Sequence, residues 1–178
     1  MAQHERGTAY YHLPGLFEFY ELYRVFLPLF REHREYFYDW CEIGSVYGAP
    51  ADCIWGGGRT GFGDAQPHRV LALMQEYGIS ARLTFSNSLL REEHLADRKC
   101  NALCALFEKE NRVQNGVIVH SDLLLDYLKR QYPGLYFAGP DAGGRPADAD
   151  GNLRQAGACG AGRCRYPGYQ PYHRRRFL

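Results

Sequence analysis

Two polar side chains stand where α/β proteins place their chemistry, each directly after an apolar stretch typical of a strand. His120 follows Gly-Val-Ile-Val, and Asn87 follows the run from Ile79 to Ser86. Functional groups in α/β folds gather just beyond the carboxyl ends of parallel strands. We therefore expect His120 and Asn87 to be catalytic residues, with His120 as a binding or acid–base group. A structural histidine and a turn asparagine are the alternatives.

A glycine-rich stretch offers a different kind of site. Gly56, Gly57 and Gly58 are followed by Arg59, so free backbone N–H groups lie beside a guanidinium. This combination can hold a phosphate or carboxylate. No Gly-Lys-Ser/Thr follows, so the stretch is not a P-loop. We expect Arg59 to bind an anionic ligand or cofactor group, the alternative being a loop that turns over the rim of the fold.

Cysteines and carboxylates within the first 137 residues give weaker indications. Cys100 and Cys104 are four residues apart in a predicted helix, which places them on one face. This spacing favours the core over a metal pair, because no further ligands follow at metal-site spacing. We expect no metal and no cofactor in this chain. Glu42 lies in a predicted strand, where it either faces the interior or pairs with a cation such as Arg82.

These residues need a framework, and strand-like and helix-like segments alternate as far as Phe137. The predicted strands are Ala9–Leu13, Asp39–Val46, Ile79–Ser86, Gly116–His120 and a last one beginning at Leu135. The predicted helices are Leu16–Phe37 (which Pro28 should kink or split), His68–Tyr77, Glu92–Glu110 and Asp122–Tyr132, the last capped by Ser121. Such alternation predicts a parallel sheet, either doubly wound or barrel-forming. Four and a half units match half a (β/α)8 barrel, so we expect a partial TIM barrel at residues 9–137.

Composition changes abruptly after Phe137. Residues 138–178 contain no Lys, Glu, Ile, Val, Met, Ser, Thr or Trp, while Gly, Ala, Arg and Pro fill 26 of the 41 positions. Few of these residues suit a strand or a core, whereas GC-rich codons read out of frame give this composition. We expect an irregular or disordered tail, in which Cys159 and Cys164 form no metal site. A genuine low-complexity linker is the alternative.

Charge and hydropathy limit partners and compartment. The arginines of the tail come without any lysine, so codon bias explains them better than nucleic-acid binding does. No segment resembles a signal peptide or a membrane span. We therefore expect a cytoplasmic protein with reduced thiols and no membrane partner.

Several stretches resemble the collagenase-like peptidase family, a group of TIM-barrel proteins. They are Tyr38–Gly48, Gly78–Asn87 and Gln114–Asp122, the last followed by Leu128–Pro133. The resemblance covers roughly residues 9–137. It implies a TIM-barrel fold and a parent enzyme that hydrolyses peptide bonds or, as in related members, hydroxylates RNA bases or quinones without oxygen. It also implies that His120 and Asn87, at matching strand ends, face the site.

The family's cluster-binding cysteines and its Lys-Ile-Glu-Gly-Arg-like element lie further along the chain and have no counterpart here. The resemblance therefore implies that an iron–sulfur cluster belongs to a full-length parent and that this chain is an inactive fragment. A half-barrel exposes a parallel edge, so we expect self-association or aggregation through it. The alternative from another class is a complete, non-enzymatic α/β binding module with a flexible basic tail.

Overall fold

The computed structural model of the chain describes residues 7–58, 65–110 and 112–138. All described residues belong to one compact unit. Of the predicted tail, only Ala138 lies among them, and it ends the last strand.

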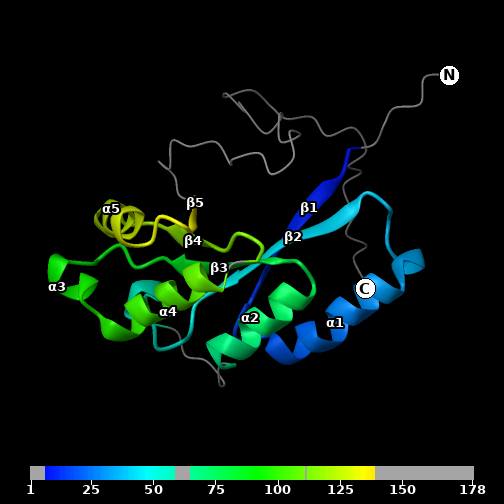
Figure 1. Ribbon diagram of the computed structural model, residues 1–178, viewed down its shortest axis with the longest axis horizontal. Coiled ribbons are helices and arrows are strands. Elements are labelled where there is room, and N and C mark those ends of the chain that lie inside the picture. Colours follow the sequence, from blue (N-terminus) through cyan, green and yellow to red (C-terminus); the bar gives the residue numbers. More distant parts are fainter. Residues whose placement is uncertain (1–6, 59–64, 111, 139–178) are drawn as a thin grey trace, which may run out of the picture. The chain divides into compact units, whose positions relative to one another are not determined.

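Five parallel strands form one sheet in which neighbours in space are also neighbours along the chain (Figure 1). The strands are β1 (Ala9–Pro14), β2 (Cys41–Gly48), β3 (Ser80–Phe85), β4 (Gly116–Val119) and β5 (Tyr136–Ala138). Doubly wound sheets reverse their strand order at a switch point. No reversal occurs among the described strands, so the predicted parallel α/β sheet is confirmed and these strands contain no switch point.

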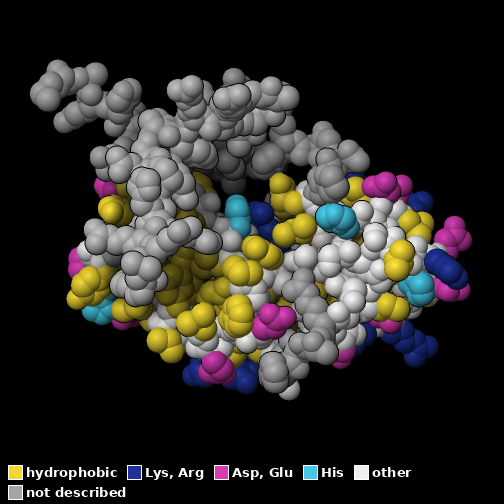
Figure 2. Space-filling view, turned by 180° about the vertical axis from the view of Figure 1, so that it is seen from behind, with side chains coloured by type: hydrophobic (Ala, Val, Ile, Leu, Met, Phe, Trp, Pro, Cys, Tyr) yellow, Lys and Arg dark blue, Asp and Glu magenta, His cyan; other side chains and the backbone are white. Residues whose placement is uncertain are grey.

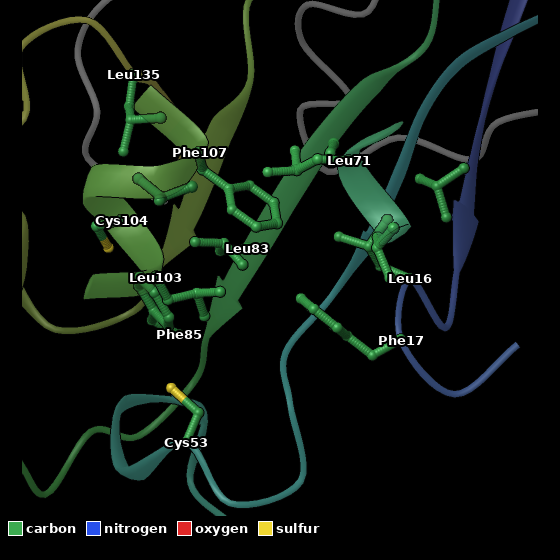
Figure 3. Close-up of a cluster of buried hydrophobic side chains, with 14 of the residues drawn as sticks. Leu16, Phe17, Cys53, Leu71, Leu83, Phe85, Leu103, Cys104, Phe107 and Leu135 are labelled. Carbon is green, nitrogen blue, oxygen red and sulfur yellow. The ribbon is translucent and has the colours of Figure 1, made fainter. Parts of the chain in front are cut away.

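Four longer helices connect the strands and bury residues in a single core against one face of the sheet. They are α1 (Tyr20–Glu32), α2 (Pro67–Glu76), α4 (Arg98–Lys109) and α5 (Asp122–Gln131), with three short elements α3 (Glu92–Leu95), η1 (Arg34–Tyr36) and η2 (Ile54–Gly56). Right-handed crossovers in a sequentially ordered sheet place successive helices on the same side. The core shows this, with Leu83 and Phe85 of β3 lying against Leu103 and Phe107 of α4 (Figure 3). None of the described helices combines the length and apolar character needed to cross a membrane.

The first connection differs from the predicted helix over residues 16–37. Gly15 has a left-handed backbone with φ of 78°, and Leu16 and Phe17 after it are buried in the core. Residues 16–19 form turns, and α1 begins only at Tyr20. Pro28 lies inside α1 rather than splitting it, and the helix ends at Glu32.

The predicted single helix from Glu92 to Glu110 is two helices. Asp97 interrupts it and caps α4, because its carboxylate accepts a hydrogen bond from the Cys100 N–H at 2.8 Å. Aspartate favours caps over helix interiors, since its side chain competes for backbone N–H groups. The predicted cap of α5 is confirmed, as Ser121 Oγ accepts from the backbone N–H of Leu124.

Candidate functional site

The sheet face opposite the helices carries polar side chains. In β3, Ala81, Leu83 and Phe85 point toward the helices and are fully buried, so Arg82 and Thr84 point to the other face. Residues in register across parallel strands lie on the same face. The register extends this face to both sides of β3 and brings together six side chains, here called the polar-face cluster: His12, Ser45, Tyr47, Arg82, Thr84 and Tyr136.

A β-bulge at Gly44 shapes one side of the polar-face cluster. The pairing of β1 with β2 shifts by one residue, so that His12 lies beside Ser45 rather than Gly44. The Nδ1 atom of His12 is 2.7 Å from Ser45 Oγ, which is a side-chain hydrogen bond. A Cβ atom at Gly44 would lie only 2.9 Å from the imidazole Cε1. The glycine therefore leaves room for the ring, while the buried Ser45 hydroxyl fixes its orientation through Nδ1.

The absence of a side chain at Gly116 brings Arg82 close to an aromatic ring. Arg82, Gly116 and Tyr136 are in register across β3, β4 and β5. The guanidinium carbon lies 5.1 Å from the centre of the Tyr136 ring, within the range of a cation–π contact. A Cβ atom at Gly116 would lie 2.6 Å from the Tyr136 carbonyl oxygen and 3.2 Å from its ring. Glycine is therefore the residue that permits this packing.

Arg82 carries its positive charge without a counterion among the described residues. Its Nε atom is buried and has no hydrogen-bond acceptor among these residues. The buried hydroxyl of Thr84 has no hydrogen-bond partner among them either. Buried donors nearly always have partners, so an unpaired arginine nitrogen is a strong anomaly. Arg34 differs in having a counterion: its guanidinium stacks on Phe30 at 4.4 Å and binds the Glu42 carboxylate at 3.1 Å, although its Nη1 atom is also buried without a partner.

Burial and charge perturb His12 and Arg82 of the polar-face cluster. Burial, and second to it the charge of Arg82, lowers the pKa of His12 below its ordinary value. Burial also lowers the pKa of Arg82, although an arginine keeps its proton at neutral pH. The cluster thus places a neutral imidazole near a positive charge. This arrangement can bind an anion through Arg82 and take up a proton at His12.

The residues predicted from the sequence lie at the carboxyl ends of β3 and β4. His120 is exposed, and its backbone N–H donates to the carbonyl of Phe85 at 3.1 Å, which holds the two strand ends together. The side chain of Asn87 binds the surrounding loop: Nδ2 donates to the carbonyl of Ile54 at 2.9 Å, and Oδ1 accepts from the N–H of Leu89 at 2.9 Å. These contacts give the Asn87 side chain a structural role in the loop. The catalytic roles of Asn87 and His120 stay predictions.

Two further sequence-based expectations have different outcomes. Arg59 lies outside the described residues. Glu42 pairs with a cation, which is one of the two predicted alternatives, but the cation is Arg34 and not Arg82, the example suggested from the sequence. The reason is local, because Arg34 belongs to η1, the turn that leads directly into β2.

The cysteine expectation is confirmed in part. Cys100 and Cys104 are both buried on the inner face of α4, as their spacing predicts. Within the described ranges, no group of three or more His, Cys, Asp or Glu side chains is placed to hold a metal ion. The described residues therefore do not fit an iron–sulfur cluster.

Sequence reasoning missed His12 and Arg82 as site residues. For Arg82 a signal was present in the sequence. Strand alternation places Arg82 on the face opposite to that of the apolar Ala81 and Leu83. A charged side chain is rare on either face of a buried strand. For His12 no local signal exists. Only the bulge at Gly44 brings its ring to Ser45.

Comparison with protein-family models, with curated proteins and with solved structures found no match for this chain. The resemblance to collagenase-like peptidases therefore stays a prediction, and the polar face of the sheet is the candidate site that the structure itself offers.

Proposed function

We propose that residues 9–138 are the first half of a TIM-barrel enzyme whose interior binds the anionic group of its substrate. The sequential strand order and the helices on one face support the barrel. In such a barrel the helix-covered face is the outside and the polar face becomes the interior. The two outer strands of the described sheet, β1 and β5, then pair with strands that further βα units supply.

The surface of α1 supports the same completion. On one flank α1 packs on α2, where the Arg69 guanidinium lies over the Tyr20 ring at 5.0 Å. On its other side, Leu22, Val25 and Leu29 are 60%, 69% and 43% exposed, an apolar stripe at helical spacing. Figure 2, which shows the molecule from behind, has hydrophobic side chains gathered in the region of α1. A closed barrel covers this flank with the last helix of the ring.

The unpaired Arg82 is the observation that carries the proposed activity. A guanidinium binds a carboxylate or phosphate with two parallel hydrogen bonds, and such a ligand would satisfy the buried Nε. His12 stands in the neighbouring row with Nδ1 held by Ser45, so Nε2 is the atom that exchanges a proton with the substrate. We assign Arg82 the role of binding the anionic group and His12 that of acid–base catalyst. A peptide carboxylate suits the resemblance to peptidases, and a phosphate shares the same chemistry.

Binding of small anions tests the proposal directly. Phosphate and succinate are titrated against the full chain, with sodium chloride at matched ionic strength as reference, while heat of binding and the histidine ring resonances are recorded. Arg82→Met should weaken binding at least about tenfold, as expected for loss of a charge-assisted hydrogen bond. The matched control is Arg34→Met, because Arg34 also stacks on a ring but already holds Glu42. Equal binding by both variants contradicts the proposal, and the stronger of the two anions identifies the substrate group.

A non-enzymatic α/β module remains the second candidate, because one continuous core unites the sheet with all four longer helices. Size-exclusion chromatography and thermal unfolding separate the two. A half-barrel with open edges should self-associate and unfold broadly. A monomer with one sharp transition and no anion binding favours the module.

A further inference from the structure

A cavity and a pair of thiols occur together on the opposite side of the core from the polar-face cluster. The cavity, of about 830 Å³, lies between the loop after β2, the start of α2 and one face of α4. Cys53 from that loop and Cys100 from α4 both line it. Their sulfur atoms are 3.1 Å apart although the residues are 47 positions apart in the chain. Figure 3 shows the Cys53 sulfur directed toward α4.

The two thiols have different electrostatic surroundings. The contact with the Cys100 thiol is the largest influence on Cys53 and lowers its pKa, and the backbone of Gly56 and Trp55 lowers it further, while burial opposes this. The same contact and burial raise the pKa of Cys100. Thiolate character decides which cysteine attacks a disulfide. These directions favour Cys53 as the attacking sulfur and Cys100 as the resolving one.

We propose that Cys53 and Cys100 form a redox-active dithiol that exchanges with low-molecular-weight disulfides admitted by the cavity. The Cys53 thiolate attacks one sulfur of the small disulfide, forming a mixed disulfide and releasing the first thiolate. Cys100 then loses its proton and attacks Cys53 Sγ, which releases the second thiolate and leaves the Cys53–Cys100 disulfide. The protein dithiol is oxidised by two electrons, the small disulfide is reduced to two thiols, and these carry the two protons.

The cavity fits this substrate class in size and in charge. Its volume lies within the range of small-molecule pockets. Its lining includes an ion pair between Asp52 and Lys99 and also His68. Charges of both signs suit a small zwitterionic peptide disulfide such as oxidised glutathione. The sulfur atoms themselves lie in the wall, since Cys53 is 2% and Cys100 is 1% exposed, so access passes through the cavity.

Oxidised glutathione is the probe that tests the proposal. The reduced full chain is incubated with it, quenched by alkylation and mapped by mass spectrometry without reduction, with fragment spectra assigning each sulfur. The wild-type chain should yield the Cys53–Cys100 disulfide. Cys100→Ser should stop at a glutathione adduct on Cys53, and Cys53→Ser should reduce adduct formation at Cys100 at least tenfold.

Cys104→Ala is the matched control, because Cys104 lies one turn further along α4, is fully buried and does not line the cavity. It should react as the wild-type chain does. Two results with the wild-type chain overturn the proposal. In the first, Cys53 and Cys100 can still be alkylated while the half-buried Cys41 carries glutathione. In the second, a glutathione adduct on Cys53 is never resolved by Cys100. Both readouts use the unmodified chain, so they hold even where a variant fails to fold.

Discussion

Replacing Arg82 by methionine should stabilise the fold while it abolishes the candidate site. The buried Nε of Arg82 has no acceptor in the described residues, and an unsatisfied buried donor costs about 1–3 kcal/mol. Methionine keeps most of the side-chain volume and removes that donor. It also removes the contact with the Tyr136 ring, worth about 0.5–1 kcal/mol. The net gain in unfolding free energy should be about 1 kcal/mol.

The matched change at Arg34 should have the opposite sign. Nη2 of Arg34 donates to the Cys41 carbonyl at 2.9 Å and to the Glu42 carboxylate at 3.1 Å. Hydrogen bonds to charged groups contribute about 1.5–3 kcal/mol, and the partial exposure of this pair reduces its share to about 1 kcal/mol. Arg34→Met should therefore lower the unfolding free energy by about that amount. Nη1 of Arg34 is also buried without a partner, so the loss stays at this modest size.

Urea unfolding of the wild-type chain and both variants measures the differences in unfolding free energy. They are expected as shifts of the urea midpoint with no change in the slope of free energy against urea concentration. Titration of the histidine ring resonances adds a second readout. Because the charge of Arg82 helps to lower the pKa of His12, Arg82→Met should move that pKa upward, toward 6.5. A lowered pKa in the folded state means that stability is present above pH 6.5 and falls as the pH drops below it. The variant should lose less stability over this window.

Two results refute this reasoning. If Arg82→Met destabilises the chain as much as Arg34→Met does, the Nε atom has a partner in solution and the site is a structural ion pair. If the pKa of His12 does not move, the two side chains do not share one electrostatic site.

Three further changes have defined outcomes. Gly116→Ala should lower the unfolding free energy by about 1–3 kcal/mol, because the new Cβ would lie 2.6 Å from the Tyr136 carbonyl oxygen. Urea unfolding measures this loss, and an unchanged urea midpoint contradicts the close packing of Gly116 against Tyr136. Asp97→Ala should cost about 1 kcal/mol through loss of the α4 cap. The pKa of Asp97 is lowered by its bond from the backbone, so its contribution is present above about pH 4 and is lost as the pH falls further, and the variant should lack this acid dependence. Oxidation of Cys53 and Cys100 to a disulfide closes a loop of 47 residues and should raise the unfolding free energy by about 4 kcal/mol. The measurement is the melting temperature, which should be higher without reductant than with it. An unchanged melting temperature would show that the disulfide does not fit the native geometry.

Local patterns in the sequence determined the sheet class and the core faces. Alternating apolar positions and helical spacing are properties of a few neighbouring residues, so the five strands, the buried face of α4 and the Ser121 cap could be predicted. Short connections between alternating elements also predicted parallel pairing. Boundaries were less predictable, because residues 16–19 form turns before α1 and Asp97 divides a continuous apolar pattern.

The tertiary structure alone decided which polar groups meet. The Cys53–Cys100 contact joins residues 47 positions apart, and the His12–Ser45 bond joins residues 33 apart across a bulge that no local pattern marks. Strand register decides such pairings, and a shift of one residue moves a side chain to the other face. The sequence likewise offered Arg82 a partner in Glu42, but Glu42 binds Arg34. The absence of a counterion depends on every described residue that packs around a charge. The uncompensated charge of Arg82, which marks the candidate site, could therefore be identified only from the tertiary structure.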